Sequence, residues 1–307
     1  MKTVIITGAT SGIGFAVCKE LLRTGYSVIG VGHSMEKCVA VKKQFDEEFP
    51  ESKTVFFHAD LMQQSEVNRV ACELGVYLDE NHDGRLDVLI NNAGCVRSWY
   101  STSEDGYEQQ FALNHLSPFL LTYYMLPFLL KGDGRVLVTS SDSHKGIRVH
   151  WKDMMYKKGY RPLMVYKQSK LCNMLTVYAL NERLGASGIK AYGIDPGLVN
   201  TDIGLKNTGG LVKLVWSLRK KHGTDPSVPA KTYAFICSNK QAPRGMYYYL
   251  CKEKEYSRQV TKENAGRLFA LSERLCGISF DKYAVPGKSP DTLGYWHICN
   301  QLQTNRR

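Results

Sequence analysis

Short runs rich in β-branched residues alternate with segments of helical spacing through the first two-thirds of the 307-residue chain. The candidate strands are residues 4–6, 28–31, 55–57, 88–90, 136–139 and 191–194, with a further run at 246–250. The candidate helices include residues 15–24, 64–78, 108–130 and 166–184. Strands that alternate with helices form parallel βαβ units. The sequence therefore predicts an α/β fold, a doubly wound Rossmann-type sheet of about seven strands with helices on both faces.

No linker rich in Pro, Gly or Ser divides the chain, and no internal repeat is present. We therefore expect a single domain over residues 1–280, followed by a C-terminal extension over residues 281–307. Residues 142–165 and 204–224 fit the alternation poorly, and both follow strand ends, where open α/β sheets build ligand sites. We expect residues 204–224 to form a substrate lid. Residues 142–165 are expected to combine a substrate wall with ordinary surface packing.

The net charge is +11, but the basic residues are spread widely apart from a run at residues 219–221. A nucleic-acid partner is not expected, because no basic stripe is interleaved with aromatic residues. A solvated basic surface is the simplest interpretation, and peripheral contact of residues 219–221 with an anionic membrane is an alternative. No apolar run approaches the ~20 residues that cross a bilayer, and the N-terminus opens as a strand. A soluble chain is expected.

Nine cysteines are scattered through apolar segments without a Cys-x-x-Cys pair. The sequence therefore predicts reduced thiols and a cytoplasmic location, with no structural zinc. Residues 79–84 resemble the start of a calcium-binding loop, but the position that should hold glutamate is Ile90, inside a predicted strand. No metal site is expected.

A glycine-rich turn follows the first predicted strand and opens the first helix. Glycines in such a turn let the backbone approach a pyrophosphate, and the helix N-terminus offers free N–H groups to phosphates. The spacing is GxxxGxG instead of the commoner GxGxxG. The turn predicts dinucleotide binding by Gly8, Thr10, Ser11, Gly12, Ile13 and Gly14.

Polar residues follow two further predicted strands. Asp60 and Leu61 follow the third, at the edge where an adenine would lie, although Asp60 could equally cap a helix. Residues 91–94, Asn-Asn-Ala-Gly, follow the fourth. The asparagines can bond the backbone of neighbouring strand ends, and the small residues Ala93 and Gly94 leave room for a cofactor.

Tyr166 and Lys170 stand four residues apart in a predicted helix, so both side chains lie on one face. A phenol has a pKa of about 10, and a nearby cation lowers it, so the pair suits proton exchange with a carbonyl or alcohol oxygen. Tyr248 and Lys252 have the same spacing, so spacing alone does not identify a site.

Together these motifs resemble the short-chain dehydrogenase/reductase family, and they span about two-thirds of the chain in the family's order. Residues 114–122 and 268–278, and the long segment before Tyr166, resemble its retinol-dehydrogenase-like branch; the protochlorophyllide reductases have a similar layout. The matching positions are residues 7–14, Asp60, residues 91–94, Asn114, Ser141, residues 166–170 and residues 196–201.

The resemblance implies a catalytic set of Asn114, Ser141, Tyr166 and Lys170. Tyr166 would exchange the proton, and Lys170 would lower the tyrosine pKa and bind the nicotinamide ribose. Ser141, preferred over Ser140 by motif register, would polarise the carbonyl. Asn114 would hold a relay water, although a buried asparagine that bonds backbone is the alternative. The nicotinamide carboxamide would lie against Pro196, Gly197, Val199 and Thr201.

The implied cofactor is NADP(H), with NAD(H) possible. The acidic residue that binds ribose in NAD-preferring relatives is missing after the second predicted strand, where His33 and Ser34 stand. These two residues, with Lys37, would hold the 2′-phosphate in place of the branch's usual arginine. The cofactor-binding residues are thus expected to be the six of the glycine turn, with His33, Ser34, Asp60, Leu61, Asn92, Ala93, Gly94, Tyr166, Lys170, Pro196, Gly197, Val199 and Thr201.

The sequence thus predicts an enzyme that interconverts a carbonyl and an alcohol with NADP(H). Apolar residues in the two irregular stretches favour a lipophilic or aromatic aldehyde or ketone as substrate: Trp151, Met154, Met155, Leu211 and Trp216. The alternative is a non-catalytic NADP(H)-binding scaffold or sensor. The long helices are compatible with a monomer or a homo-oligomer.

Overall fold

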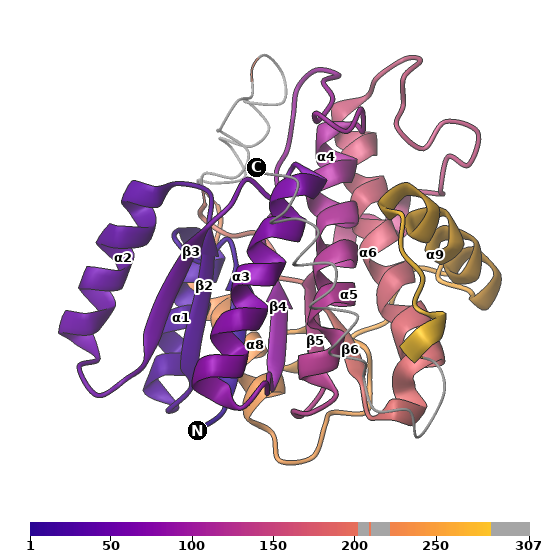
Figure 1. The fold of residues 1–307 in the computed structure, drawn as a ribbon. Coiled ribbons are helices and arrows are strands. Elements are labelled where there is room, and N and C mark those ends of the chain that lie inside the picture. Colours follow the sequence, from indigo (N-terminus) through magenta and orange to yellow (C-terminus); the bar gives the residue numbers. More distant parts are fainter. Residues whose placement is uncertain (202–208, 210–221, 284–307) are drawn as a thin grey trace, which may run out of the picture.

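The computed structural model describes residues 1–201, 209 and 222–283 (Figure 1). Within them the strands form one sheet in the order β3-β2-β1-β4-β5-β6-β7-β8. The first seven are parallel, as predicted. Their bounds are Thr3–Thr7 (β1), Ser27–Gly32 (β2), Thr54–His58 (β3), Val88–Asn91 (β4), Arg135–Thr139 (β5), Lys190–Ile194 (β6) and Tyr247–Tyr249 (β7).

An eighth strand, β8 (Lys252–Glu253), was not predicted and runs antiparallel to β7. Leu250 and Cys251 form the turn between them, with φ angles of 47° and 61°. Positive φ at both turn residues suits the twist of a tight hairpin but is usually supplied by Asn or Gly. Because Leu and Cys carry no turn signal, the sequence pattern did not reveal this hairpin.

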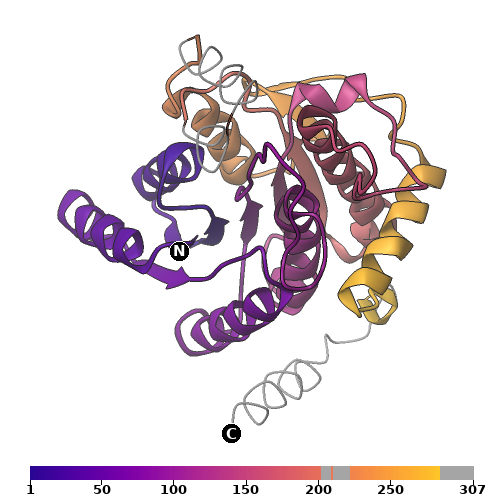
Figure 2. The same cartoon turned by 90° about the horizontal axis from the view of Figure 1, so that it is seen from above.

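Helices cover both faces of the sheet, as Figures 1 and 2 show. Alternate strand residues point to opposite layers: Ile5 belongs to one apolar cluster with α3, α5, α6 and α9, whereas Val4 and Ile6 belong to a second with α1, α2 and α8. The bounds are Gly12–Arg23 (α1), Met35–Glu48 (α2), Gln64–His82 (α3), Gln109–Phe111 (α4), Ser117–Leu129 (α5), Pro162–Leu184 (α6), Ser227–Ser238 (α8) and Lys262–Cys276 (α9). Three 3₁₀ turns span Asp142–Gly146, Gly185–Ser187 and Asp281–Tyr283.

The helix predicted over residues 108–130 is interrupted by a π-helical turn, Ala112–Leu116, between α4 and α5. Asn114 lies in this turn, where its side chain bonds the backbone of Cys95. Such turns accommodate one extra residue and are frequent at functional sites. The apolar spacing of the segment does not distinguish a π turn from a continuous α-helix.

The segment between β5 and α6 packs its apolar side chains on the protein core, which is the packing part of the expectation for residues 142–165. Met154 is buried in the larger apolar cluster, where Trp151 and Met155 also pack. The Trp151 ring lies 4.2 Å from the Arg267 guanidinium on α9. The predicted lid, residues 204–224, lies largely outside the described residues. The chain just before it bonds the last residue of the predicted lid: Asn200 N–H donates to Thr224 O (2.9 Å), and Thr224 N–H donates to Leu198 O (2.8 Å).

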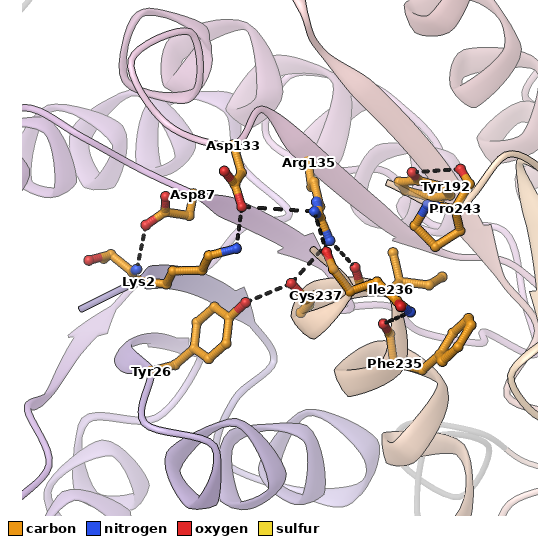
Figure 3. Close-up of polar contacts among 12 residues, drawn as sticks. Lys2, Tyr26, Asp87, Asp133, Arg135, Tyr192, Phe235, Ile236, Cys237 and Pro243 are labelled. Carbon is orange, nitrogen blue, oxygen red and sulfur yellow. Dashed lines mark hydrogen bonds and ion pairs between the residues drawn. The ribbon is translucent and has the colours of Figure 1, made fainter. Parts of the chain in front are cut away.

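A buried arginine holds the C-terminus of α8 against the amino ends of the strands (Figure 3). Arg135 begins β5 and is 2% exposed. Its guanidinium donates to the carbonyls of Ile236, Cys237 (3.1 Å) and Asn239 (2.7 Å) at the end of α8. Tyr26 O–H also donates to Cys237 O (2.7 Å). A cation that bonds the last carbonyls of a helix satisfies groups without intrahelical partners and complements the helix dipole.

In the part of the chain that the structure describes, seven cysteines are free thiols, but Cys72 on α3 is disulfide-bonded, so the prediction of uniformly reduced cysteines is wrong there. Spacing alone does not reveal such a pairing. Within residues 1–201 and 222–283, no helix combines the length and the apolar character that crossing a bilayer requires.

Candidate functional site

One cavity of about 1010 Å³ lies at the carboxyl edge of the sheet. It opens between β1 and β4, where the strand order reverses and where doubly wound sheets bind their ligands. Of the residues predicted to catalyse or to bind cofactor, all line this cavity except Gly14 and Asn114, which pack directly behind its wall. The fold therefore brings the separate sequence motifs together.

The glycine turn connects β1 to α1 and depends on close backbone packing. Gly8 and Gly12 have φ angles of 67° and 55°, which residues with a Cβ rarely adopt. At Gly14 a Cβ atom would lie 2.2 Å from Gly8 O and 2.7 Å from Asn92 Nδ2. Ser11 precedes the helix without capping it through its side chain. The first N–H groups of α1 can therefore bond a phosphate, which makes this turn fit a dinucleotide.

Asn92 ties together the ends of three strands. Its side-chain amide donates to Thr7 O on β1 (3.0 Å), and its Oδ1 accepts from the Thr139 hydroxyl on β5 (3.3 Å). The Thr7 hydroxyl accepts from the N–H groups of Asn92 and Ala93, both at 3.0 Å. The network confirms the predicted bonding of neighbouring backbone for Asn92 and holds Ala93 at the cavity wall. Asn91 does not follow that prediction, because its side-chain amide donates to the Thr122 hydroxyl (3.1 Å).

The far end of the cavity contains His33, Ser34, Lys37 and Asp60. His33 Nδ1 lies 3.5 Å from Asp60 Oδ1, and the imidazole is largely exposed. Ser34 caps α2 by accepting from Lys37 N–H (3.3 Å). Asp60 does not cap α3, whose N-cap is Gln63, and accepts from Met62 N–H instead (3.2 Å). This end thus offers cationic and hydroxyl groups close to one carboxylate.

Tyr166 and Lys170 lie one turn apart on α6 with both side chains at the cavity. Lys170 Nζ is 5.6 Å from the Tyr166 ring centroid and donates to Thr139 O (2.9 Å). The lysine is 3% exposed, and burial lowers the pKa of Lys170 to about 8. The competing pair, Tyr248 and Lys252, is not helical, because these residues stand on β7 and β8.

Asn114 connects the π turn to the cavity wall and to α6. Its Oδ1 accepts from Cys95 N–H (2.7 Å), and its amide donates to Cys95 O (3.0 Å) and to the Ser169 hydroxyl (3.0 Å). A Cβ atom at Gly94 would lie 3.1 Å from Asn114 Oδ1 and 3.8 Å from Lys170 Nζ. Asn114 is thus a backbone-bonded buried asparagine, and it lies close behind the Lys170 ammonium.

Ser140 and Ser141 both reach the cavity but differ in their bonding. The Ser140 hydroxyl is buried and donates to Lys170 O (3.2 Å). Ser141 is partly exposed, and its hydroxyl accepts only the N–H of Ser143 (3.3 Å) among the described residues. The Ser141 hydroxyl hydrogen is therefore available to a ligand, which supports the motif-based choice of Ser141.

Asp195 and Lys254 also line the cavity but were not selected from the sequence. Lys254 Nζ lies 3.0 Å from Asp142 Oδ1 and 3.2 Å from Asp195 Oδ2. Asp195 is buried and also accepts from Gly197 N–H (3.0 Å). A signal for Asp195 was its position directly before the Pro-Gly turn. Lys254 had none, because it follows the unpredicted hairpin.

Comparison with known proteins agrees with this geometry. A family model described as short chain dehydrogenase matches residues 2–209. Human retinol dehydrogenase 13 is 33% identical over 291 residues, which cover 90% of this chain and 85% of that protein. Human polyprenol dehydrogenase is 31% identical over 264 residues, which cover 82% of this chain and 78% of that protein.

Solved structures share the fold. An uncharacterised protein from Mycobacterium paratuberculosis superposes with a TM-score of 0.69 at 29% identity, covering 91% of this chain and 95% of that chain. An alcohol dehydrogenase from Thermococcus sibiricus, solved with 5-hydroxy-NADP, has a TM-score of 0.63 at 20% identity, covering 83% of this chain and 100% of its own. At 20% identity, the superposition on the alcohol dehydrogenase supports the shared fold and nothing more.

Proposed function

The chain belongs to the short-chain dehydrogenase family, and we propose that it reduces a carbonyl to an alcohol, reversibly, with NADPH and with Tyr166 as general acid and base. The observation that carries this proposal is the Tyr166–Lys170 pair, one helical turn apart at the cavity, with the ammonium 5.6 Å from the phenol ring. A buried cation beside a phenol favours the phenolate form. Tyr166 is therefore suited to pass a proton to or from a substrate oxygen.

The other members of the site would serve that proton transfer. The Ser141 hydroxyl would donate to the substrate carbonyl oxygen, where negative charge develops during reduction. Lys170, held by Thr139 O at 2.9 Å, is fixed beside Tyr166. Asn114, anchored to the backbone of Cys95, would keep a water close to the Lys170 ammonium and so connect the site to solvent protons.

The cofactor proposal rests on the fit of the residues that would hold it. A bound nicotinamide dinucleotide would supply or accept the hydride. The turn from Gly8 to Gly14 would hold its pyrophosphate, and Asp60 and Leu61 would lie at the adenine. The Pro196–Thr201 stretch comes close to the glycine turn, since a Cβ at Gly12 would lie 3.1 Å from Thr201 Cγ2. His33, Ser34 and Lys37 would favour NADP(H) over NAD(H), because they place positive charge and hydroxyl groups where a 2′-phosphate would bind.

A lipophilic alcohol or its carbonyl counterpart is the proposed substrate. The support is the similarity to proteins named retinol and polyprenol dehydrogenase. Trp151, Met154 and Met155 no longer support it, because none is among the described residues that line the cavity. The contributions of Leu211 and Trp216 stay predictions, since both lie outside the described residues.

The test is NADPH oxidation by purified protein across aliphatic and aromatic aldehydes, ketones, quinones and retinal, and NADP⁺ reduction with the matching alcohols. Tyr166→Phe should lower kcat by roughly 10²–10⁴-fold and leave NADPH binding unchanged, because only the proton donor is lost. Turnover that persists in the variant would refute the role of Tyr166. Tight NADPH binding without turnover on any substrate would favour the scaffold alternative.

A further inference from the structure

We propose that His144 is a positioning residue that orients Ser141 through the Ser141 carbonyl, an inference that rests on the proposed catalytic role of Ser141. His144 lies in the 3₁₀ turn that directly follows Ser141, and its side chain is fully buried. It does not line the cavity. Its effect on a reaction would therefore pass through the residues it holds.

Both ring nitrogens of His144 bond backbone groups of different segments. Nδ1 lies 2.6 Å from Ser141 O, and Nε2 lies 3.0 Å from the backbone nitrogen of Ser257. A carbonyl only accepts and an N–H only donates, so Nδ1 must carry the hydrogen and Nε2 must be bare. The surroundings thus specify a neutral imidazole in the Nδ1–H tautomer. Protonation would place a second N–H against that of Ser257.

The ring is fixed from the sides as well. It packs edge-on against Tyr247 of β7, with centroids 5.0 Å apart. Burial lowers the pKa of His144, which favours the neutral form that the two bonds require. The charged groups that act on it are Asp142 and Lys145 of its own turn and Asp195 after β6.

The segment after β8 holds the Ser141 turn at two points. Ser257 N–H bonds the His144 ring, and Lys254 pairs with Asp142 at 3.0 Å. The Ser141 carbonyl accepts both the ring Nδ1–H and the backbone N–H of His144 (3.1 Å). With its carbonyl held by two donors of His144 and its hydroxyl by the N–H of Ser143, Ser141 would present its hydroxyl to the cavity in one direction. A catalytic donor needs such fixed orientation, because small displacements weaken its bond to the reacting oxygen.

Two substitutions separate the bonds made by the ring. His144→Asn keeps an amide donor near the position of Nδ1 and loses the acceptor for Ser257. His144→Gln places an amide oxygen near Nε2 and loses the donor to Ser141. Both lose the ring, so both should lower the melting temperature similarly. We expect kcat to fall roughly tenfold in His144→Gln, to stay within about threefold of wild type in His144→Asn, and NADPH affinity to be unchanged in both.

The decisive comparison repeats His144→Gln in a Ser141→Ala background. If His144 acts through Ser141, the second substitution should add no further loss of kcat. An equal loss in both backgrounds, or equal losses in the Asn and Gln variants, would overturn the inference. If Ser141→Ala leaves wild-type turnover unchanged, the proposed role of Ser141 fails, and the inference with it.

A measurement on the wild-type protein does not depend on how well the variants fold. The ¹⁵N chemical shifts of the histidine ring distinguish the two neutral tautomers and the imidazolium. We expect the Nδ1–H tautomer for His144 at neutral pH, with assignment by comparison with His144→Asn. An Nε2–H tautomer or an imidazolium at that pH would contradict the proposed bonding.

Discussion

A methyl group added at Gly14 should disturb both folding and cofactor binding. The new Cβ would lie 2.2 Å from Gly8 O and 2.7 Å from Asn92 Nδ2, so α1 must move by roughly 1 Å to restore ordinary contact. Overpacking of this kind costs about 1–3 kcal/mol. Alanine is favoured over glycine inside a helix by about 0.5–1 kcal/mol, which offsets part of the loss. We expect Gly14→Ala to lower the free energy of unfolding by about 1–2 kcal/mol.

Gly266 provides a matched control, because it lies inside α9 with no atom within 4 Å of its added Cβ. There only the helix preference acts, and Gly266→Ala should raise the free energy of unfolding by about 0.5–1 kcal/mol. The same chemical change is thus expected to have opposite signs at the two positions.

Urea denaturation of both variants measures the free energies, and NADPH titration followed by fluorescence measures the affinity. Gly14→Ala should weaken NADPH binding at least tenfold, because the shifted helix carries the N–H groups proposed to hold the pyrophosphate. Gly266→Ala should bind as wild type does. Wild-type stability and affinity in Gly14→Ala would refute the claim that close packing at this turn supports the site.

Three further changes test separate parts of the molecule. His33→Asp should weaken NADPH binding at least tenfold and spare NADH, by equilibrium titration, because a carboxylate repels a 2′-phosphate; equal losses would contradict the NADP(H) proposal. Burial lowers the pKa of Lys170 to about 8, below the ~10.4 of an unfolded lysine. Between these two values the unfolded chain binds more protons than the folded chain, so the stability that the buried charge costs at neutral pH is regained as the pH rises. We expect Lys170→Met to have a higher free energy of unfolding than wild type in cofactor-free urea denaturation at pH 7, and this difference should shrink by about 2 kcal/mol by pH 9.5. A difference that does not change with pH would argue against the burial effect. Arg135→Met should destabilise by about 2–4 kcal/mol, because the carbonyls of Ile236 and Asn239 lose their guanidinium donor and Cys237 O keeps only the Tyr26 hydroxyl; an unchanged urea midpoint would count against that anchoring.

The sheet was predictable because its strands carry a strong local pattern. Buried parallel strands read as continuous β-branched runs, and residues 4–6 and 28–31 fall inside β1 and β2. The site motifs could be placed for a related reason. Most of them stand at the end of a strand, and parallel strands bring their carboxyl ends to one edge. Tyr166 and Lys170 are exceptions, because they stand on α6 and were found from their helical spacing.

Apolar side chains in an irregular segment indicate burial but do not indicate the partner. Trp151 and Met154 could therefore be assigned to packing or to a substrate wall from the sequence, and the structure places them against α9 and on the core. The bond between His144 and Ser257 links residues 113 positions apart, and no residue near either one in the sequence indicates it. Contacts of that range depend on how the C-terminal segment returns to the sheet, and no local spacing encodes them.

The paired backbone at Leu198, Asn200 and Thr224 has a consequence for how the protein can diverge. The chain just before residue 202 and the chain just after residue 221 are bonded to each other here. A flexible connection between two fixed points can be lengthened at a cost of only about 0.6 kcal/mol for each doubling. Substitutions, insertions or an exchanged segment could therefore accumulate there while the hydrogen bonds around Tyr166 and Lys170 stay intact. The junction is a natural place to graft a loop from a relative and ask whether substrate preference travels with it.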